Sequence, residues 1–309
     1  MAYSRIRRRR VRRRRNPIRR NRVTRTRRVR TYRSRRMRLP RRSILNLTSV
    51  KKKDSMGHVT NVGTGSTTTF TTNPAIFTQN GAQPYATSIW MFSPSARDQT
   101  INAGGSDEVA VALRNSTRTY SKGYGESIQI RTNTGASWKW RRVVILNKNT
   151  TLYGTPGSPT PIYRDTAGTG MQRIVAPLNN SQFAILTEQL IVGNPGSGDS
   201  VDIFAFKFDP NRCKVLYDKT VAFNGGNQYG WSRSFNQYFP IQKTVVYNET
   251  ENADSETSNY LSAPGALNSA GDILVIDFLA CQSAPDPASG APVHSLSLTL
   301  DGRYYWHER

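Results

Sequence analysis

The sequence predicts an all-β protein, a sandwich of two antiparallel sheets preceded by a disordered, arginine-rich N-terminal arm. Three observations support this prediction. Basic residues are concentrated at the start of the chain, apolar and polar residues alternate through the rest, and Gly, Pro, Asn, Ser and Thr interrupt the alternation at short intervals. At least eight segments have the composition of strands, and no amphipathic helix is evident.

The 309-residue chain has a net charge of +24, which is distributed very unevenly. The first 53 residues hold 22 Arg, 3 Lys and no acidic residue, whereas residues 54–309 hold 19 basic and 20 acidic residues. A generally basic globular domain is therefore excluded. We expect residues 1–42 to form an arm and residues 43–309 one domain, in which residues 43–54 are a basic hinge into the first strand.

The arm has the composition of a polyanion-binding segment. More than half of the residues in Met1–Arg42 are arginine, so like charges repel and little apolar surface offsets the entropy of ordering. Guanidinium groups bind phosphate oxygens in pairs and stack on unpaired bases, and nothing in the arm predicts readout of base sequence. We expect non-specific, salt-sensitive binding to nucleic acid. The residues assigned to this binding are Arg7, Arg8, Arg9, Arg10, Arg12, Arg13, Arg14, Arg15, Arg19, Arg20, Arg27, Arg28, Arg35, Arg36, Arg41, Arg42, Lys51, Lys52 and Lys53.

The same arm matches the loose pattern of a nuclear-import signal, in the clusters Arg7–Arg10, Arg12–Arg15 and Arg35–Arg42. A host import receptor is therefore an expected partner. No apolar stretch is long enough for a membrane span, and no apolar region follows the N-terminal charges as in a secretory signal. The two cysteines are too few for a disulfide framework and fit a reducing compartment.

Strands are expected from the alternation that follows the arm. Ile44, Leu45, Leu47 and Val50 are spaced to begin the first strand, with Lys51–Lys53 facing the inside of an assembly. Gly123–Arg131 and Trp138–Leu146 flank a Gly-containing turn and predict a hairpin whose second strand is buried on both faces. Further β-rich segments are Phe183–Val192, Val201–Phe208, Cys213–Phe223, Lys243–Tyr247, Asp272–Cys281 and Val293–Leu300.

No catalytic constellation emerges from the sequence. The three histidines, His58, His294 and His307, are far apart and have no metal-ligand spacing, and the glycine-rich loops lack the Lys-Ser/Thr pair of a phosphate-binding loop. Cys213 and Cys281 are expected in or near the core. The acidic segment 249–256 lacks the spacing of an EF-hand, so a solvated loop or a contact with a neighbouring subunit is favoured over a calcium site. No enzyme activity, cofactor or metal is predicted.

The roles of two pairs of residues in the segment 138–142 have more than one interpretation. Arg141 and Arg142 point to opposite faces of a strand, so at most one contacts DNA, and an intersubunit salt bridge is favoured. Trp138 and Trp140 share one face, for which core packing or a subunit contact is favoured over base stacking.

Five segments, in order along the chain, resemble segments of genomovirus capsid proteins. One of them, KVLYDKT, also resembles a segment of geminivirus-like capsid proteins. The five segments are TSVKKKDSM (Thr48–Met56), KGYGESIQIRTNTGASWKWRRVVI (Lys122–Ile145), KVLYDKT (Lys214–Thr220), YFPIQKTVVYNE (Tyr238–Glu249) and YYWHER (Tyr304–Arg309).

This resemblance implies a viral jelly-roll protein that self-assembles into an icosahedral shell of roughly 60 copies (T=1), packages circular single-stranded DNA and assembles in the host nucleus. The alternative is a cellular nucleic-acid-packaging or ribosomal protein with a basic extension. Ribosomal extensions usually mix Lys with Arg and their globular parts are also basic, so the neutral body disfavours this alternative. A nucleic-acid-processing enzyme is disfavoured by the lack of a catalytic cluster.

Overall fold

A computed structural model describes residues 40–79, 87–99, 112–155, 158–193, 202–226, 229–253, 255–257, 259–283 and 293–308. The chain divides into two units, Met1–Ile44 and Leu45–Arg309. The described part of the first unit is Pro40 and the start of helix α1 (Arg41–Thr48). Predictions for residues 1–39 therefore lie outside the described residues. All strands among the described residues belong to the second unit.

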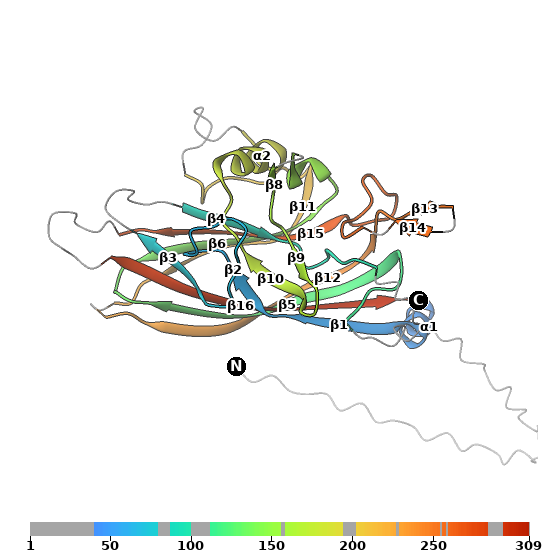
Figure 1. The fold of residues 1–309 in the computed structure, drawn as a ribbon, viewed down its shortest axis with the longest axis horizontal. Helices are drawn as coiled ribbons and strands as arrows, with labels where there is room; N and C mark the ends of the chain where they lie inside the picture. Colours follow the sequence, from blue (N-terminus) through green and yellow to red (C-terminus); the bar gives the residue numbers. More distant parts are fainter. Residues whose placement is uncertain are drawn as a thin grey trace, which may run out of the picture. The chain divides into compact units, whose positions relative to one another are not determined.

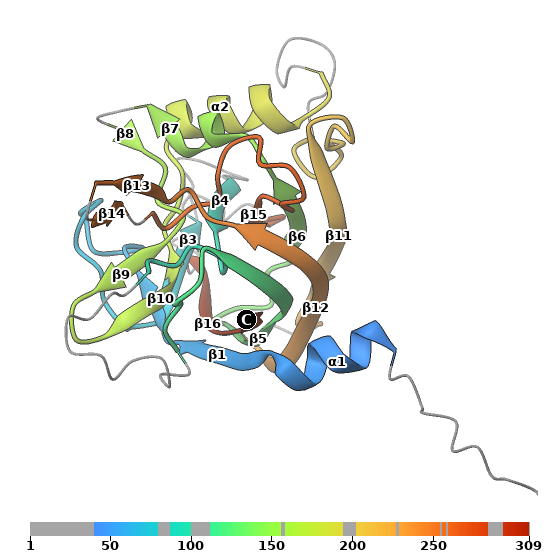
Figure 2. The same cartoon turned by 90° about the vertical axis from the view of Figure 1, so that its right-hand side faces the viewer.

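A five-stranded and a four-stranded antiparallel sheet form the sandwich (Figure 1 and Figure 2). In spatial order the first sheet contains β1 (Val50–Met56), β16 (His294–Glu308), β5 (Arg118–Thr132) and β12 (Ser232–Val246), and β3 (Ala75–Gln79) also pairs with β16. The second sheet contains β11 (Cys213–Phe223), β6 (Trp138–Asn147), β15 (Asp272–Cys281) and β4 (Thr87–Phe92).

Apart from β3, the order of these strands is that of an eight-stranded jelly roll. Numbered along the chain from one to eight, they run 1-8-3-6 in the first sheet and 2-7-4-5 in the second. The pairs 1 with 8, 2 with 7, 3 with 6 and 4 with 5 are all antiparallel neighbours, as in a long hairpin that has been rolled up. The predicted all-β jelly-roll sandwich is therefore confirmed.

Most of the remaining elements lie in the connection between β6 and β11. They are η2 (Thr150–Tyr153), β7 (Gly154–Thr155), β8 (Ser158–Pro159), β9 (Arg164–Thr166), β10 (Gly170–Val175) and α2 (Asn180–Leu190). Elsewhere, β2 (His58–Thr60) pairs in parallel with β10, and β13 (Thr250–Asn252) pairs with β14 (Ser255–Thr257).

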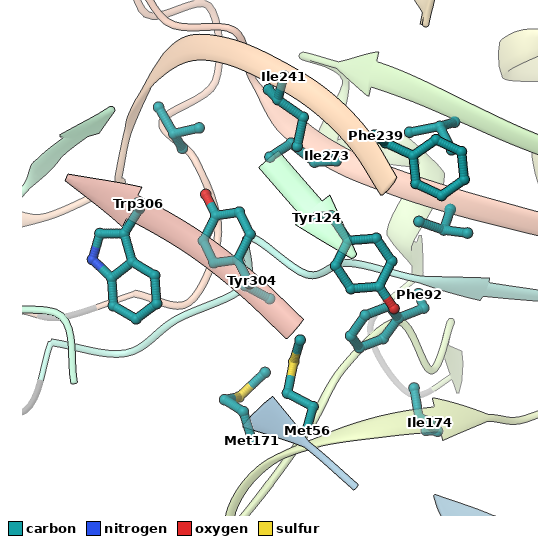
Figure 3. Close-up of a cluster of buried hydrophobic side chains, with 14 of the residues drawn as sticks. Met56, Phe92, Tyr124, Met171, Ile174, Phe239, Ile241, Ile273, Tyr304 and Trp306 are labelled. Atoms are coloured by element: carbon teal, nitrogen blue, oxygen red, sulfur yellow. The ribbon is translucent and has the colours of Figure 1, made fainter. Parts of the chain in front are cut away.

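The core fills both sides of the second sheet. Between the sheets, Phe92 and Ile273 of the second sheet pack with Tyr124, Phe239 and Tyr304 of the first (Figure 3). On the other side, α2 covers the sheet in Figure 1, and its buried Leu186 and Leu190 join the outward-facing residues of β4, β6 and β15 in a second cluster. Every position of β15 is consequently buried, which explains why its sequence is almost entirely apolar apart from Asp272 and Asp277.

The predicted hairpin of residues 123–146 is wrong, although both of its strands exist. β5 pairs with β12 and β16, whereas β6 pairs with β11 and β15 in the other sheet. The turn between them carries the chain across the sandwich. A turn sequence sets a change of direction, but the partner of each strand is decided by the whole sheet. The expected burial of the second strand on both faces is confirmed.

Three local predictions also need correction. Phe183–Val192, expected as a strand, lies largely in helix α2, which begins with a capping box in which the Asn179 side chain accepts from Gln182 N at 2.8 Å and the Gln182 side chain accepts from Asn179 N at 2.9 Å. The described part of 201–208 contains turns and a single β-bridge. The chain is helical in α1 until Thr48, so the first strand begins at Val50. Cys213–Phe223 and Asp272–Cys281 are strands with the predicted bounds.

Candidate nucleic-acid interface on the first sheet

The basic residues that follow the arm are divided between two faces of β1. Lys51 and Lys53 are exposed, while Lys52 between them is buried, because successive side chains of a strand point to opposite faces. In the register of the first sheet, Lys51 lies opposite His307 of β16 and Lys53 lies opposite Tyr305. Two of the three lysines therefore share the outer face of the sheet with an aromatic residue and a histidine.

The prediction that all three lysines face the same way is wrong for Lys52. Its side chain is buried, and Nζ lies 3.1 Å from Oε2 of Glu308 in an ion pair. Nζ also donates to the carbonyl oxygen of Leu113 at 2.8 Å and to Oδ1 of Asn115 at 2.9 Å. Lys52 thus joins β1 to the last strand and to the segment before β5, and its ammonium is not available to phosphate.

A pair of tyrosines lies beside these lysines, above two glycines of β5. Tyr238 of β12 is opposite Gly125, and Tyr305 of β16 is opposite Gly123, so the two rings flank the same stretch of β5. Their centroids are 6.3 Å apart and their planes differ by 59°. A Cβ on Gly123 would lie 2.8 Å from the carbonyl oxygen of Phe239 and would overlap the Tyr238 hydroxyl, so only glycine fits there.

Lysines and tyrosines together line a shallow depression of about 440 Å³ on this face. The name basic depression is used below for the exposed or half-buried residues of its lining, Lys51, Lys53, Lys122, Tyr238, Tyr305 and His307. None of these residues is acidic. The depression combines cationic groups that bind phosphate with aromatic rings that stack on bases, which is the composition of a surface for single-stranded nucleic acid.

The positive charge of the depression affects the pKa of His307. Burial, followed by the charges of Lys122 and Lys51, lowers the pKa of this imidazole below its ordinary value. His307 is therefore neutral at neutral pH. An anion placed between the lysines would offset their effect and favour protonation of the ring.

The structure brings only part of the predicted binding set together. Lys51 and Lys53 lie in the basic depression, and Arg41 and Arg42 lie in the first turn of α1. The other assigned arginines, from Arg7 to Arg36, lie outside the described residues, as do those proposed for nuclear import.

Sequence reasoning missed Lys122, Tyr238, Tyr305 and His307. The available signal was the alternation of Gly123 and Gly125 within a strand, which marks a place where another group approaches the backbone closely.

Arg141 and Arg142 are engaged within their own chain, which corrects both alternatives considered for them. Arg141 Nε and a terminal nitrogen donate to the two carboxylate oxygens of Asp218 at 2.9 and 2.6 Å. Arg142 forms ion pairs with Glu126 and Asp277, and Arg173 joins the same two carboxylates. All four side chains of this second group are fully enclosed between the sheets. It is called the buried ion-pair network below.

The network holds its charges without access to solvent. Burial alone would raise the pKa of Glu126, but the neighbouring Arg142 and Arg173 outweigh it and lower this pKa to about 2. Tyr124 donates to Glu126 at 2.7 Å, and Trp140 Nε1 donates to Asp277 at 2.9 Å. Trp138 and Trp140 are both buried, in agreement with the expectation of core packing. The network therefore serves to join four strands.

The other candidate residues do not come together in a site within the part of the chain that the structure describes. Glu249, from the acidic segment, is paired with Arg114 inside the protein, and Arg114 stacks on Tyr247. Within the described ranges, no group of three or more His, Cys, Asp and Glu residues is placed to hold a metal ion. Cys213 and Cys281 are buried as free thiols, and burial raises the pKa of Cys213 to about 11. No helix of the described residues is long and apolar enough to cross a membrane.

Strand order and the basic depression define the class of this protein as a jelly-roll sandwich with a cationic, tyrosine-containing face. No known protein family and no curated protein matches the chain. Among solved structures, VP1 of Merkel cell polyomavirus in complex with 3'-sialyllactosamine is 11% identical over 84% of this chain and 94% of that chain, with a TM-score of 0.18. VP1 of Trichodysplasia spinulosa-associated polyomavirus in complex with 3'-sialyllactose is 8% identical over 84% and 79%, with a TM-score of 0.08. Similarity at this level carries no argument, so the jelly-roll assignment depends on the strand order.

Proposed function

We propose that this chain is a structural capsid protein. It self-assembles into a closed icosahedral shell and packages circular single-stranded DNA through its N-terminal arm. The observation that supports the proposal most strongly is that a strongly basic arm is joined to a nearly neutral domain. A block of 25 basic residues with no acid precedes a nearly neutral jelly roll, a fold that viral shells use because its tapered sandwich tiles well.

The basic depression supports this assignment. Lys51 and Lys53 continue the basic run of the arm into β1, and they lie with Lys122 on the outer face of the first sheet. In the proposed shell this face lines the interior, where it meets the same polyanion as the arm. In the smallest shell (T=1), roughly 60 copies supply on the order of 1,500 positive charges, which suits a genome of one to a few kilobases.

The finer assignment is to a genomovirus or a close relative, with assembly in the host nucleus. It depends on the five segments that resemble genomovirus capsid proteins. Four of these segments contribute to the basic depression. TSVKKKDSM contains Lys51 and Lys53, and KGYGESIQIRTNTGASWKWRRVVI begins with Lys122. YFPIQKTVVYNE begins with Tyr238, and YYWHER contains Tyr305 and His307. We assign the chain a structural role and no catalytic one, since the four charged groups of the buried ion-pair network are paired with one another.

Electron microscopy of the expressed full-length protein tests the proposal, together with ultraviolet absorbance and nuclease treatment of the same fractions. Closed particles of uniform size that contain nuclease-resistant DNA are expected. Soluble monomers that lose their nucleic acid in moderate salt would instead favour a cellular packaging or ribosomal protein.

The role of the arm is tested by deleting residues 1–42. We expect the shortened chain to form shells that contain no DNA, since the jelly roll lies outside the deleted segment. Shells of the shortened chain that still retain DNA would contradict the proposed role. Fused to a cytoplasmic reporter, residues 1–53 are expected to direct it to the nucleus, and an unchanged distribution would remove the import receptor from the expected partners.

A further inference from the structure

We propose that Tyr238 and Tyr305 form a stacking platform for unpaired bases of the packaged strand, while Lys51, Lys53 and Lys122 bind its phosphates. This inference rests on the proposed capsid function and adds a second, ordered contact with nucleic acid besides the arm. The two contacts differ in kind. The arm offers positive charge in great excess with two scattered tyrosines, whereas the platform offers two neighbouring aromatic rings at a defined place in the fold.

The backbone of β5 orients the Tyr238 ring. A Cβ built on Gly123 would meet Cζ of Tyr238, and a Cβ built on Gly125 would lie 3.5 Å from its Cδ2. The ring therefore spans both glycines and lies along the strand. One side of it rests on the β5 backbone, while 51% of the residue stays exposed. Such a ring is fixed before any ligand arrives, so stacking on it costs little ordering entropy.

Tyr305 extends this surface on the neighbouring strand. Its ring lies 3.9 Å from the Cβ position of Gly125, and its centroid is 6.3 Å from that of Tyr238. The ring planes are inclined by 59°, so a single flat base cannot lie on both rings at once. The platform accordingly suits two bases of a bent single strand. Bases of a duplex are already stacked and paired, so they offer no free face.

Cations border the rings on the β1 side and on β5. Lys51 and Lys53 are separated by two residues of strand, a distance of about 7 Å, and Lys53 lies directly opposite Tyr305. The closest acid on the outer face of β16 is Asp301, four residues from Tyr305 and about 13 Å along the strand. The lysines attract an anion, and a nucleotide chain also supplies a flat face for each tyrosine ring. An acidic side chain of a neighbouring subunit would pair with the lysines and leave both rings uncovered, so the combination favours single-stranded nucleic acid.

The platform is poorly suited to reading base identity. Its lining contains no Asn, Gln, Arg, Asp or Glu to form paired hydrogen bonds with base edges, and its lysines are assigned to phosphates. Every base has a flat face, so stacking tolerates any sequence. A genome can therefore be bound along its whole length by identical subunits.

Photocrosslinking of the full-length protein tests the platform. The probe is a thymidine oligonucleotide in which single positions carry 5-iodouracil, which couples to aromatic rings on irradiation. After proteolysis, mass spectrometry is expected to find adducts on the peptides that contain Tyr238 and Tyr305. Adducts confined to the arm, at Tyr3 or Tyr32, would overturn the inference and leave the packaging function of the arm intact. This measurement uses the unaltered chain and so does not depend on the folding of any variant.

A second experiment measures the contribution of the bases. Affinity is compared between a thymidine oligomer and an abasic oligomer with the same number of phosphates. The ratio of the two affinities is expected to fall about fivefold or more in the Y238L/Y305L variant and to be retained in Y238F/Y305F, because phenylalanine stacks as tyrosine does. The matched control is Y229L, which removes an exposed tyrosine outside the depression.

An unchanged ratio in Y238L/Y305L would overturn the inference. Particles of that variant that still protect DNA would show that the proposed capsid function stands without the platform. A wild-type protein that retains no nucleic acid at all would instead count against the capsid function itself.

Discussion

Arg142 and Asp277, on neighbouring strands of the second sheet, form a bidentate ion pair. Arg142 Nε lies 2.7 Å from Oδ1 of Asp277, and a terminal guanidinium nitrogen lies 3.0 Å from Oδ2. The two residues are register partners of β6 and β15, and neither is exposed. The same carboxylate contacts Arg173 of β10, and Glu126 of β5 closes the network from the opposite sheet. Charges are thus used in the middle of the sandwich to hold its two sheets together.

Substitution of Asp277 by Asn is expected to be strongly destabilising. It leaves two buried guanidinium groups with one carboxylate, and an unpaired buried charge costs about 3–5 kcal/mol of unfolding free energy. The measurement is urea-induced unfolding at neutral pH. Asp202→Asn is the matched control, because Asp202 pairs with Lys139 at 3.6 Å near the surface, where such a pair contributes about 1 kcal/mol or less. Equal stabilities of the two variants would show that the network does not support the fold.

Neighbouring lysines of β1 are expected to respond in opposite ways. Lys52→Gln removes the cation paired with buried Glu308 and should lower the free energy of unfolding by about 3 kcal/mol. Lys53→Gln should leave stability within about 0.5 kcal/mol, since its side chain is exposed. With oligonucleotide, Lys53→Gln should reduce the slope of log affinity against log salt by about one unit. A reduced salt slope for Lys52→Gln, together with an unchanged slope for Lys53→Gln, would show that Lys52 and not Lys53 contacts the oligonucleotide.

Two glycines of β5 provide a test of the close packing under Tyr238. Gly123→Ala places a methyl group 2.8 Å from the Phe239 carbonyl oxygen and against the tyrosine ring, so we expect a loss of about 1–3 kcal/mol from overpacking. In Gly125→Ala the closest atom lies at an ordinary 3.5 Å, and a change below about 1 kcal/mol is expected. Thermal unfolding of both variants distinguishes these outcomes. A tolerated Gly123→Ala would mean that Tyr238 is not held against β5.

Stability is expected to fall in mild acid because of His58. Burial, and then the charge of Arg173, lower the pKa of this side chain to about 4, although Glu126 and a hydrogen bond with Asn73 act in the other direction. Between about pH 6.5 and 4 the unfolded chain therefore binds a proton that the folded chain does not. The free energy of unfolding therefore rises with pH across this window. Lowering the pH from about 6.5 to about 4 decreases it by up to about 3 kcal/mol.

The measurement is urea unfolding of the wild type and His58→Gln at several values between pH 4 and 7. The variant should show a smaller dependence on pH, whatever its absolute stability. His294→Gln, at a half-buried position beside Thr134, is the control for the loss of a histidine elsewhere in the fold. Identical slopes for the wild type and His58→Gln would rule out His58 as the source.

Several properties of the molecule could be predicted from local patterns. β-rich composition placed the strands Cys213–Phe223 and Asp272–Cys281 at their observed bounds, because strand propensity is a property of the local sequence. Successive side chains of a strand point to opposite faces, and this rule would have separated Lys52 from Lys51 and Lys53. The capping box of Asn179 and Gln182 was also present in the sequence and would have identified α2.

Other features depended on which segments meet in space. Arg142 could not be matched to Asp277, nor Tyr238 to Tyr305, before the order of strands in each sheet was known. The hairpin expected between β5 and β6 failed for the same reason, since its two strands lie in different sheets. Pairing across long sequence separations is selected by the packing of the whole sandwich, and a local segment carries little information about it.

A polycationic arm and a neutral β-rich body can be distinguished in the sequence, because charge and periodicity are properties of single segments. Which charges are enclosed, and which stay at the surface to bind a partner, follows from the packing of the strands. Arg141, Arg142 and Lys52 are neutralised inside the fold, whereas Lys51, Lys53 and Lys122 surround a pair of tyrosines at the surface. Burial of a charge requires a partner from another strand, and the choice of that partner follows from the register of the assembled sheets.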